Sequence, residues 1–365
     1  MDTAIFEKVL TLAHQSKASD IHFKVGAPIL LRINGELMET KSPILTAEDT
    51  YSIAKSVLVN AYPPVEAEHL REWDGSYSVP GVSRFRVNVY RQRNTIALIM
   101  RAIPFEIPNF ESLKLPEILK KISLESRGLI LVTGVTGSGK SSTLAAMVNH
   151  INNNRKCHIL TIEDPLEFMH KNIKSSISQR EIGLDTENFS LALRSALRQD
   201  PDIILVGEMR DYETIDTALR AAETGHLVLS TAHTTDAQST INRLISVFPS
   251  DKQATTRLRL AESLVATVSQ RLIPIKEGKG RVPACEIMRM TKTVEECIKD
   301  PLKTFQLKDV IEQGHDSYST QSFDQHLMWL FKDGAISYDT AHAAATHPSD
   351  FERQVLLDTG GDMPD

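Results

Sequence analysis

The residues with the clearest chemical role lie in the stretch GVTGSGKSS, which runs from Gly134 to Ser142. It fits the pattern G-x-x-x-x-G-K-S/T, in which the backbone N–H groups of a glycine-rich loop converge on phosphate oxygens. In this pattern Lys140 reaches the β and γ phosphates of a nucleotide, and Ser141 offers its hydroxyl to Mg²⁺. The expected nucleotide-binding residues of the loop are Gly134, Thr136, Gly137, Ser138, Gly139, Lys140, Ser141 and Ser142.

The neighbouring sequence favours a phosphate-binding loop over a fortuitous glycine-rich turn. The apolar run GLILVTG predicts a buried strand directly before the loop, and KSSTLAAMVNHINNN predicts a helix directly after it. The N-terminus of such a helix adds favourable potential for phosphate. We therefore expect ATP and Mg²⁺ as cofactors.

Acidic residues follow two further predicted strands. Glu163 and Asp164 come directly after HILTI, and DPDIILVGE ends in Gly207 and Glu208. Open parallel sheets bind ligands at this carboxyl edge. An ordinary Walker B strand ends in an aspartate that helps to hold Mg²⁺, but Gly207 stands at that position here. The metal then takes Ser141 together with Glu163 or Asp164, and Glu208 orients or deprotonates the attacking water. The alternative for each acid alone is a helix cap or a solvated strand end.

Two histidines flank the apolar run in GHLVLSTAHTT. His226 and His233 are seven residues apart, and an odd separation along one strand sends side chains to opposite faces. One strand therefore does not offer both to a single metal ion. His233, at the far end, is placed to contact a γ-phosphate, whereas His226 at the entry is at least as readily a structural histidine.

Arginines occupy one face of the predicted strand SRFRVNVY. Its alternation places Arg84, Arg86 and Asn88 on one face and three apolar residues on the other. The ordinary interpretation is a solvated sheet face. The functional one is that this face meets the phosphate of a neighbouring subunit, as arginine fingers do. Arg194 and Arg198 are four residues apart on a predicted helix, and for them a surface position is as plausible as a functional role.

The elements that position these residues predict an α/β protein. Residues 1–103 alternate short strands and helices and form a small α+β or α/β domain. The segment 104–115, which contains Pro104 and Pro108, is interpreted as a linker. Over 116–290, continuously apolar strands crossing over through helices imply a parallel sheet covered on both faces. Residues 291–357 are helical, and we expect 358–365 to be frayed.

Composition excludes several classes of protein. The net charge of −6 argues against a general nucleic-acid or anionic-membrane binder. The three cysteines form no C-x-x-C pair, which argues against a disulfide framework or a zinc ribbon and fits a reducing cytosol. The start carries Asp2 and Glu7 where a signal peptide is basic, and no apolar run reaches the ~18 residues of a membrane span. We expect a cytoplasmic protein.

Several stretches together resemble one family. ASDIHF, the phosphate-binding loop, TIEDPLEF, RQDPDIILVGEMRD, AAETGHLVLSTAHT and INRLISVFP are similar to the twitching-motility ATPases of the type IV pilus. These form the PilT and PilU group of the type II/IV secretion ATPase superfamily. The resemblance covers roughly residues 6–351, and 199–249 is its most specific run. It implies a PAS-like N-terminal domain and a RecA-like ATPase domain with C-terminal helices, assembled as a homohexamer.

The resemblance also implies roles for particular residues. In this family TIEDP is the Asp box, GHLVLSTAHT is the His box, and the nucleotide lies between domains with arginines of the N-terminal domain contributing. Carried over, the site residues are Glu163 and Glu208 as the acidic pair, His226 and His233 of the His box, and Arg84, Arg86 and Arg101. The implied activity is ATP hydrolysis that drives pilus retraction, with the ring docked on a platform protein at the inner-membrane base of the pilus.

Some features leave alternatives open. Extension and secretion ATPases usually have a longer N-terminal region and a tetracysteine zinc motif, and the lack of both favours retraction without zinc. However, TVEECIKD stands at 293–300 where retraction ATPases typically read AIRNLIRE, so Glu295 and Glu296 reverse the local charge. SFDQHLMWLFKDGAISYDTA is closer to the PilU type, which leaves an accessory ATPase that depends on a paralogous motor as an alternative. A nucleic-acid translocase is a second alternative, against which the acidic net charge argues.

Overall fold

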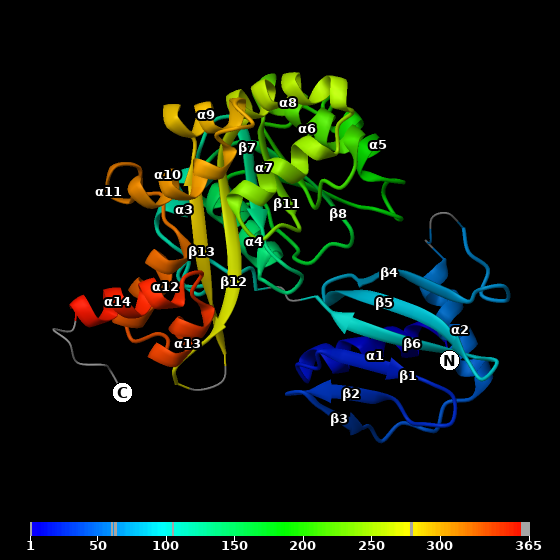
Figure 1. Cartoon of the computed structure of the whole chain (residues 1–365). Coiled ribbons are helices and arrows are strands. Elements are labelled where there is room, and N and C mark those ends of the chain that lie inside the picture. Colours follow the sequence, from blue (N-terminus) through cyan, green and yellow to red (C-terminus); the bar gives the residue numbers. More distant parts are fainter. Residues whose placement is uncertain (1, 60, 62–63, 104–105, 278–279, 359–365) are drawn as a thin grey trace. The chain divides into compact units, whose positions relative to one another are not determined.

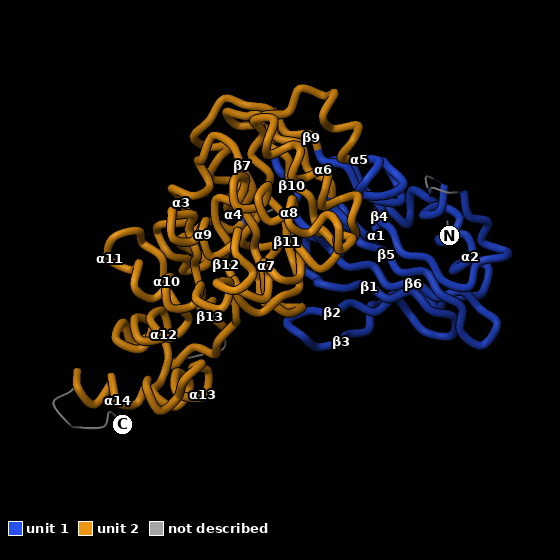
Figure 2. Tube along the Cα trace, turned by 45° about the horizontal axis from the view of Figure 1, so that its top comes forward, with its two compact units in different colours: residues 1–107, 163–170, 179–192 blue, residues 108–162, 171–178, 193–365 orange. Residues whose placement is uncertain are grey.

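The computed structural model describes residues 2–59, 61, 64–103, 106–277 and 280–358 (Figure 1). The predicted frayed tail, apart from Asp358, and part of the predicted linker lie outside these residues. Within them no helix is both long and apolar enough to cross a bilayer. The chain forms two compact units, coloured separately in Figure 2. The first unit comprises residues 1–107, 163–170 and 179–192, and the second comprises 108–162, 171–178 and 193–365.

The first unit contains a six-stranded antiparallel sheet with the order β3-β2-β1-β6-β5-β4. The strands are β1 (Asp20–Phe23), β2 (Leu30–Ile33), β3 (Glu36–Glu39), β4 (Glu72–Val79), β5 (Ser83–Gln92) and β6 (Thr95–Ala102). Two helices accompany them, α1 (Thr3–Gln15) and α2 (Ala47–Leu58). Thr46 and Asp49 form a capping box that starts α2. The rings of Phe6 and Phe23 meet edge to face in the core, with centroids 5.7 Å apart.

Strand β5 has the predicted alternation. Phe85, Val87 and Val89 are completely buried, whereas Arg84 and Arg86 lie on the other face. Strands β3 and β4 were not predicted from the sequence. All four residues of β3 are exposed, and β4 begins with the mixed run EWDG, so neither shows the apolar pattern that identifies a strand.

The second unit is built on a seven-stranded sheet with the order β13-β12-β7-β11-β10-β8-β9. Its strands are β7 (Gly128–Thr133), β8 (His158–Glu163), β9 (Ser176–Glu181), β10 (Ile203–Val206), β11 (Leu227–Ala232), β12 (Leu264–Pro274) and β13 (Arg281–Arg289). β12, β7, β11, β10 and β8 are parallel, which confirms the predicted parallel sheet. β13 is antiparallel to β12, and neither of these two strands was predicted from the sequence. The last residue of β8, Glu163, and residues 179–181 of β9 belong to the first unit.

Helices accompany this sheet and continue beyond it. Those of the ATPase-like part are α3 (Ile118–Ser123), α4 (Lys140–Asn154), α5 (Phe189–Ala196), α6 (Tyr212–Glu223), α7 (Ala237–Ser246) and α8 (Ser250–Ser263). The later ones are α9 (Lys292–Lys299), α10 (Leu307–Gln313), α11 (His315–Tyr318), α12 (Phe323–Lys332), α13 (Tyr338–Ala344) and α14 (Pro348–Asp358). A separate core cluster joins Ile273 of β12 and Val282 of β13 to Leu327 of α12 and Phe351 of α14. The β12–β13 hairpin therefore carries the last helices (Figure 1).

Candidate functional site

The predicted phosphate-binding loop connects the fully buried strand β7 to α4, as the motif requires. Gly139 caps the helix with φ 92°, and Gly134 has φ 143°. A Cβ on Gly134 would lie 2.6 Å from the carbonyl oxygen of Gln270, so no larger residue fits. Lys140 is buried and donates to the carbonyl oxygens of Gly134 (2.9 Å) and Val135 (3.0 Å). The Val135 side chain is exposed, and the loop offers its backbone rather than this side chain.

Residues from three neighbouring strand ends meet in one cavity of the second unit. It has a volume of about 490 Å³ and is lined by Thr136 of the loop, Glu208 after β10, and His233 after β11. Glu208 accepts from Arg210 (Nε to Oε1, 2.7 Å), and its Oε2 lies 3.7 Å from Nε2 of His233. The predicted water-activating carboxylate and the predicted phosphate-sensing histidine are therefore brought together beside the loop.

Burial and the positive charge of Lys140 lower the pKa of His233, although the nearby Glu208 carboxylate opposes this. The imidazole is therefore neutral at pH 7, because its ordinary pKa is already near 6.5. A neutral imidazole can donate one hydrogen bond to a phosphate oxygen. Because it carries no charge, it needs no neighbouring carboxylate to balance it.

His226 lies at the other end of β11. Its Nδ1 is 2.9 Å from the carbonyl oxygen of Ala221, and its own carbonyl accepts from Gly128 at the start of β7. Within this unit the structure does not bring His226 to the edge that carries the loop. The prediction that both histidines lie in one strand was wrong, since β11 spans only Leu227–Ala232 and they flank it. The strand-alternation argument therefore does not apply to them.

The acidic residues of the Asp box, Glu163 and Asp164, belong to the first unit. Glu163 ends β8, and its Oε1 accepts from Nε2 of Gln179 at 3.4 Å. Asp164, which precedes a cis proline, is exposed. Among the described residues no group of three or more histidine, cysteine, aspartate or glutamate side chains is arranged to hold a metal ion. Ser141, Glu163 and Asp164 nevertheless supply hydroxyl and carboxylate oxygens, which are the donors that Mg²⁺ prefers.

The three predicted arginines differ in their surroundings. Arg84 forms an ion pair with Glu181 in which the arginine side chain is 16% exposed and the glutamate side chain 1%. Arg101 donates from Nε to Oδ1 of Asp20 at 2.8 Å, and Arg86 is exposed. The sequence analysis did not identify Glu181, because a charged residue at the end of a half-polar strand is expected to be exposed.

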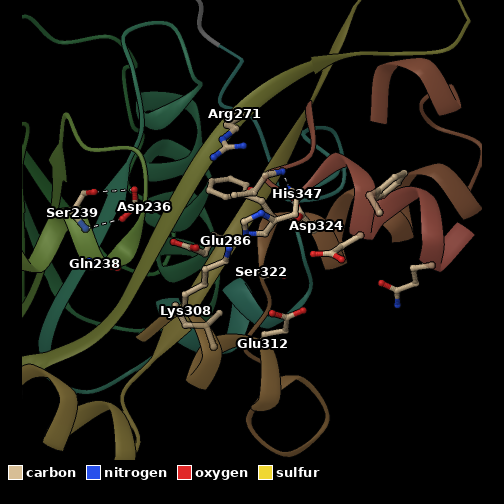
Figure 3. Close-up of a pocket in the computed structure, with 16 residues that line it drawn as sticks. Asp236, Gln238, Ser239, Arg271, Glu286, Lys308, Glu312, Ser322, Asp324 and His347 are labelled. Atoms are coloured by element: carbon tan, nitrogen blue, oxygen red, sulfur yellow. Dashed lines mark hydrogen bonds between the residues drawn. The ribbon is translucent and has the colours of Figure 1, made fainter. Parts of the chain in front are cut away.

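A second cavity of about 340 Å³ lies in the second unit between the β12–β13 hairpin, α7 and the last helices (Figure 3). Arg271, Lys308 and His347 line it together with Glu286, a residue that the sequence did not single out. Glu286 accepts from the backbone N–H of Ala237 (2.7 Å) and from the hydroxyl of Ser269 (3.3 Å). Burial raises the pKa of Glu286 to about 7.

A line of buried polar groups connects Glu286 to the phosphate-binding loop. The hydroxyl of Ser269 is 3.1 Å from the hydroxyl of Thr133, the last residue before Gly134. Ala237, which donates to Glu286, is the first residue of α7 and follows the His box. The strand that leads into the loop and the segment that follows His233 are therefore joined through Glu286.

Comparison with known proteins identifies the family. The family model described as "Type II/IV secretion system protein" matches residues 2–327. The type IV pilus retraction ATPase PilT of Pseudomonas aeruginosa is 44% identical over 344 residues, covering 94% of this chain and 99% of that protein. The type IV pilus ATPase PilU of the same organism is 38% identical over 357 residues, covering 98% of this chain and 93% of that protein.

A crystal structure of the pilus retraction motor PilT with bound ADP superposes with a TM-score of 0.84 at 40% identity, covering 97% of this chain and 99% of that one. The predicted family, the α/β fold class and the predicted ATPase activity are confirmed by these matches. The chain belongs to the type II/IV secretion system protein family and is a PilT-type ATPase.

Proposed function

We propose that this ATPase powers the retraction of type IV pili and, through it, twitching motility. The observation that carries the proposal is a full-length likeness to PilT, at 44% identity, in a chain whose loop, Glu208 and His233 share one cavity. The Neisseria gonorrhoeae twitching motility protein, 44% identical over 316 residues, supports it.

In this proposal each side chain has one task. The loop backbone and Lys140 bind the phosphates of ATP, and His233 donates to the γ-phosphate. Glu208 orients the attacking water and takes its proton, for which Glu163 is the alternative base. Ser141 and Glu163 or Asp164 hold Mg²⁺, which neutralises charge that develops on the transferring phosphoryl group.

We further propose that the chain works as a homohexamer on a platform protein at the inner membrane. PAS-like residues 1–103 and the 116–290 core would rearrange as contacts to the γ-phosphate form and are lost. Of the three arginines, Arg86 is free to reach a phosphate from its exposed position on β5. Arg84 and Arg101 could contact a phosphate directly only after breaking their ion pairs with Glu181 and Asp20.

The test replaces the native chain with Lys140→Ala in living cells whose pili are fluorescently labelled. Loss of the lysine contact to the phosphates should stop hydrolysis, so pili should extend and then stay out. Lys156→Ala is the matched control, because Lys156 is exposed and lies just beyond the C-terminal end of the second unit's helix α4, whereas Lys140 begins that helix. Absence of any pili would instead make the protein an extension motor.

A PilU-like accessory ATPase is the second candidate. It is favoured by the likeness to PilU over 98% of the chain and by the altered helix α9. There Glu295 is held between Lys292 (2.8 Å) and Lys299 (2.7 Å), so this helix presents a locally neutralised surface. Normal retraction in cells that carry Lys140→Ala, together with ATP turnover by the purified wild-type chain, would establish the accessory role.

A further inference from the structure

We propose that Glu181 is a positioning residue for ATP hydrolysis, because it ties the Asp-box loop to Arg84 of strand β5. The Asp-box loop is defined here as residues 163–170. This inference rests on the role proposed above for Glu163, but it concerns ATP hydrolysis alone and does not depend on pilus retraction.

One carboxylate oxygen of Glu181 joins two distant parts of the sequence. Its Oε2 pairs with Nη2 of Arg84, which lies 97 positions earlier, and accepts from the backbone N–H of Leu166 at 3.4 Å. The Glu181 side chain is 1% exposed, so water does not compete for these contacts. A buried carboxylate between a guanidinium and a loop amide holds both in a fixed relation.

The backbone around Glu181 is also fixed. Its N–H donates to Oδ2 of Asp185 (2.8 Å), and its carbonyl accepts from the N–H of Asp185 (2.9 Å). The next residue, Ile182, donates from its backbone to the carbonyl oxygen of Glu163 at 2.9 Å. Glu181 therefore lies at the start of a hydrogen-bonded turn, and the backbone of this turn is hydrogen-bonded to Glu163, the first residue of the Asp-box loop.

Gln179 extends the same contact along the loop. It stands two residues before Glu181, on the same face of β9. Its amide donates to Oε1 of Glu163 (3.4 Å) and to the carbonyl oxygen of Phe168 (2.9 Å), and accepts from the backbone N–H of His170 (2.8 Å). Alternate residues of β9 thus hold the beginning, middle and end of the loop, and Glu181 is the one that links this arrangement to Arg84.

The consequence for the reaction follows from geometry. Glu163 must be held close to its working position, since a displacement near 1 Å at a reacting centre can cost about 100-fold in rate. The residues expected to bind the nucleotide phosphates are those of the loop at 134–142, and Glu181 is not among them. Losing the Glu181 carboxylate should therefore lower kcat and leave KM for ATP nearly unchanged.

The experiment measures ATP hydrolysis by the purified full-length chain with Glu181→Gln, which keeps the side-chain shape. We expect kcat to fall by about 10-fold or more with KM within about 2-fold of wild type. Glu167→Gln is the matched control, an exposed glutamate on the same loop, and should behave as wild type. A kcat for Glu181→Gln within 2-fold of wild type, or a rise in KM with unchanged kcat, would overturn the proposal.

A double-mutant cycle tests whether Glu181 acts through Arg84. If it does, Glu181→Gln should lower kcat little or not at all in a chain that already carries Arg84→Gln. Independent, multiplying effects would contradict the link. If Glu181→Gln does not fold, Glu181→Asp retains the charge but withdraws it by one methylene, and the same loss of kcat with near-native melting is expected. Retention of wild-type kcat by Glu181→Asp would count against the proposal. None of these results depends on the outcome in piliated cells.

Discussion

Glu181 and Glu286 are both almost wholly buried, at 1% and 7% exposed, but their surroundings differ in kind. Glu181 meets the guanidinium of Arg84, whereas the contacts of Glu286 come from a neutral backbone N–H and a hydroxyl. The charge of Asp236 adds to the effect of burial on Glu286, while Arg271 opposes it only weakly. The comparison shows that hydrogen bonds from neutral donors lower the pKa of a buried carboxyl group but do not outweigh the effect of its burial.

The largest effect on the free energy of unfolding should come from removing the ion-pair partner of Glu181. Arg84→Gln leaves a buried carboxylate without its cation, and breaking such a pair costs about 3–5 kcal/mol in the free energy of unfolding. The sequence has two tryptophans, Trp73 in the first unit and Trp329 in the second. Chemical denaturation followed by Trp73 fluorescence in a Trp329→Phe background reports the first unit alone. Adding Glu181→Gln should restore most of the loss, and an equally unstable double variant would contradict the pairing argument.

The next effect concerns the pH dependence of stability at Glu286. Its pKa is about 7 in the folded protein and near 4.5 when unfolded. Between these values the folded state binds more protons, so stability falls as pH rises through this window and then levels off. The total fall is on the order of 3 kcal/mol, from 1.36 kcal/mol per pKa unit.

Glu286→Gln should remove this dependence, because the amide oxygen still accepts from Ala237 but does not ionise. Unfolding of the second unit, followed by Trp329 fluorescence in a Trp73→Phe background, should show the variant gaining stability relative to wild type as pH rises from about 5 to 8. The pH dependence of other groups, such as His326, whose pKa burial lowers to about 4, is common to both proteins and cancels in this difference. The variant should be more stable than wild type at pH 8. Parallel pH curves for variant and wild type would show that Glu286 is ionised at neutral pH.

A smaller effect is expected at Arg271, the cation in the same cavity as Glu286. Its guanidinium lies 3.9 Å from the ring centroid of Phe323 and donates to the carbonyl oxygen of Ala344 at 3.2 Å. Arg271→Ala should destabilise the second unit by about 1–2 kcal/mol through loss of stacking and of one hydrogen bond. Arg271→Lys keeps the charge and should recover only part of this. Full recovery would mean that charge near Glu286, rather than stacking on Phe323, is what matters.

The smallest effect is expected at Arg194, which pairs with Glu213 at 3.0 Å on the surface, where both side chains are more than half exposed. Arg194→Ala should change the free energy of unfolding by no more than about 0.5 kcal/mol. ATP turnover by the same variant decides between the two sequence-based interpretations of this helix. A wild-type kcat supports the surface interpretation, and a marked fall would assign Arg194 to the reaction.

The parts of the site that could be predicted are those whose chemistry is local in sequence. The phosphate-binding loop, Glu208 and His233 each follow a short apolar strand, and parallel pairing then brings the strand ends together. Glu181 and Glu286 could not be predicted, since the partner of the first is 97 positions away and that of the second 49. A single sequence does not indicate which of its charged residues become buried by such distant contacts.

The first unit is composed of three separate stretches of chain, and this has a consequence for any attempt to divide the protein. A truncation that begins near residue 108 would retain Glu181 and the Asp-box loop but delete Arg84. The remaining fragment would carry a buried carboxylate without its counter-ion. A chimera with a relative that exchanges only residues 1–107 would likewise replace one side of this contact and keep the other. A chimera that keeps the first unit intact must exchange residues 163–170 and 179–192 together with residues 1–107.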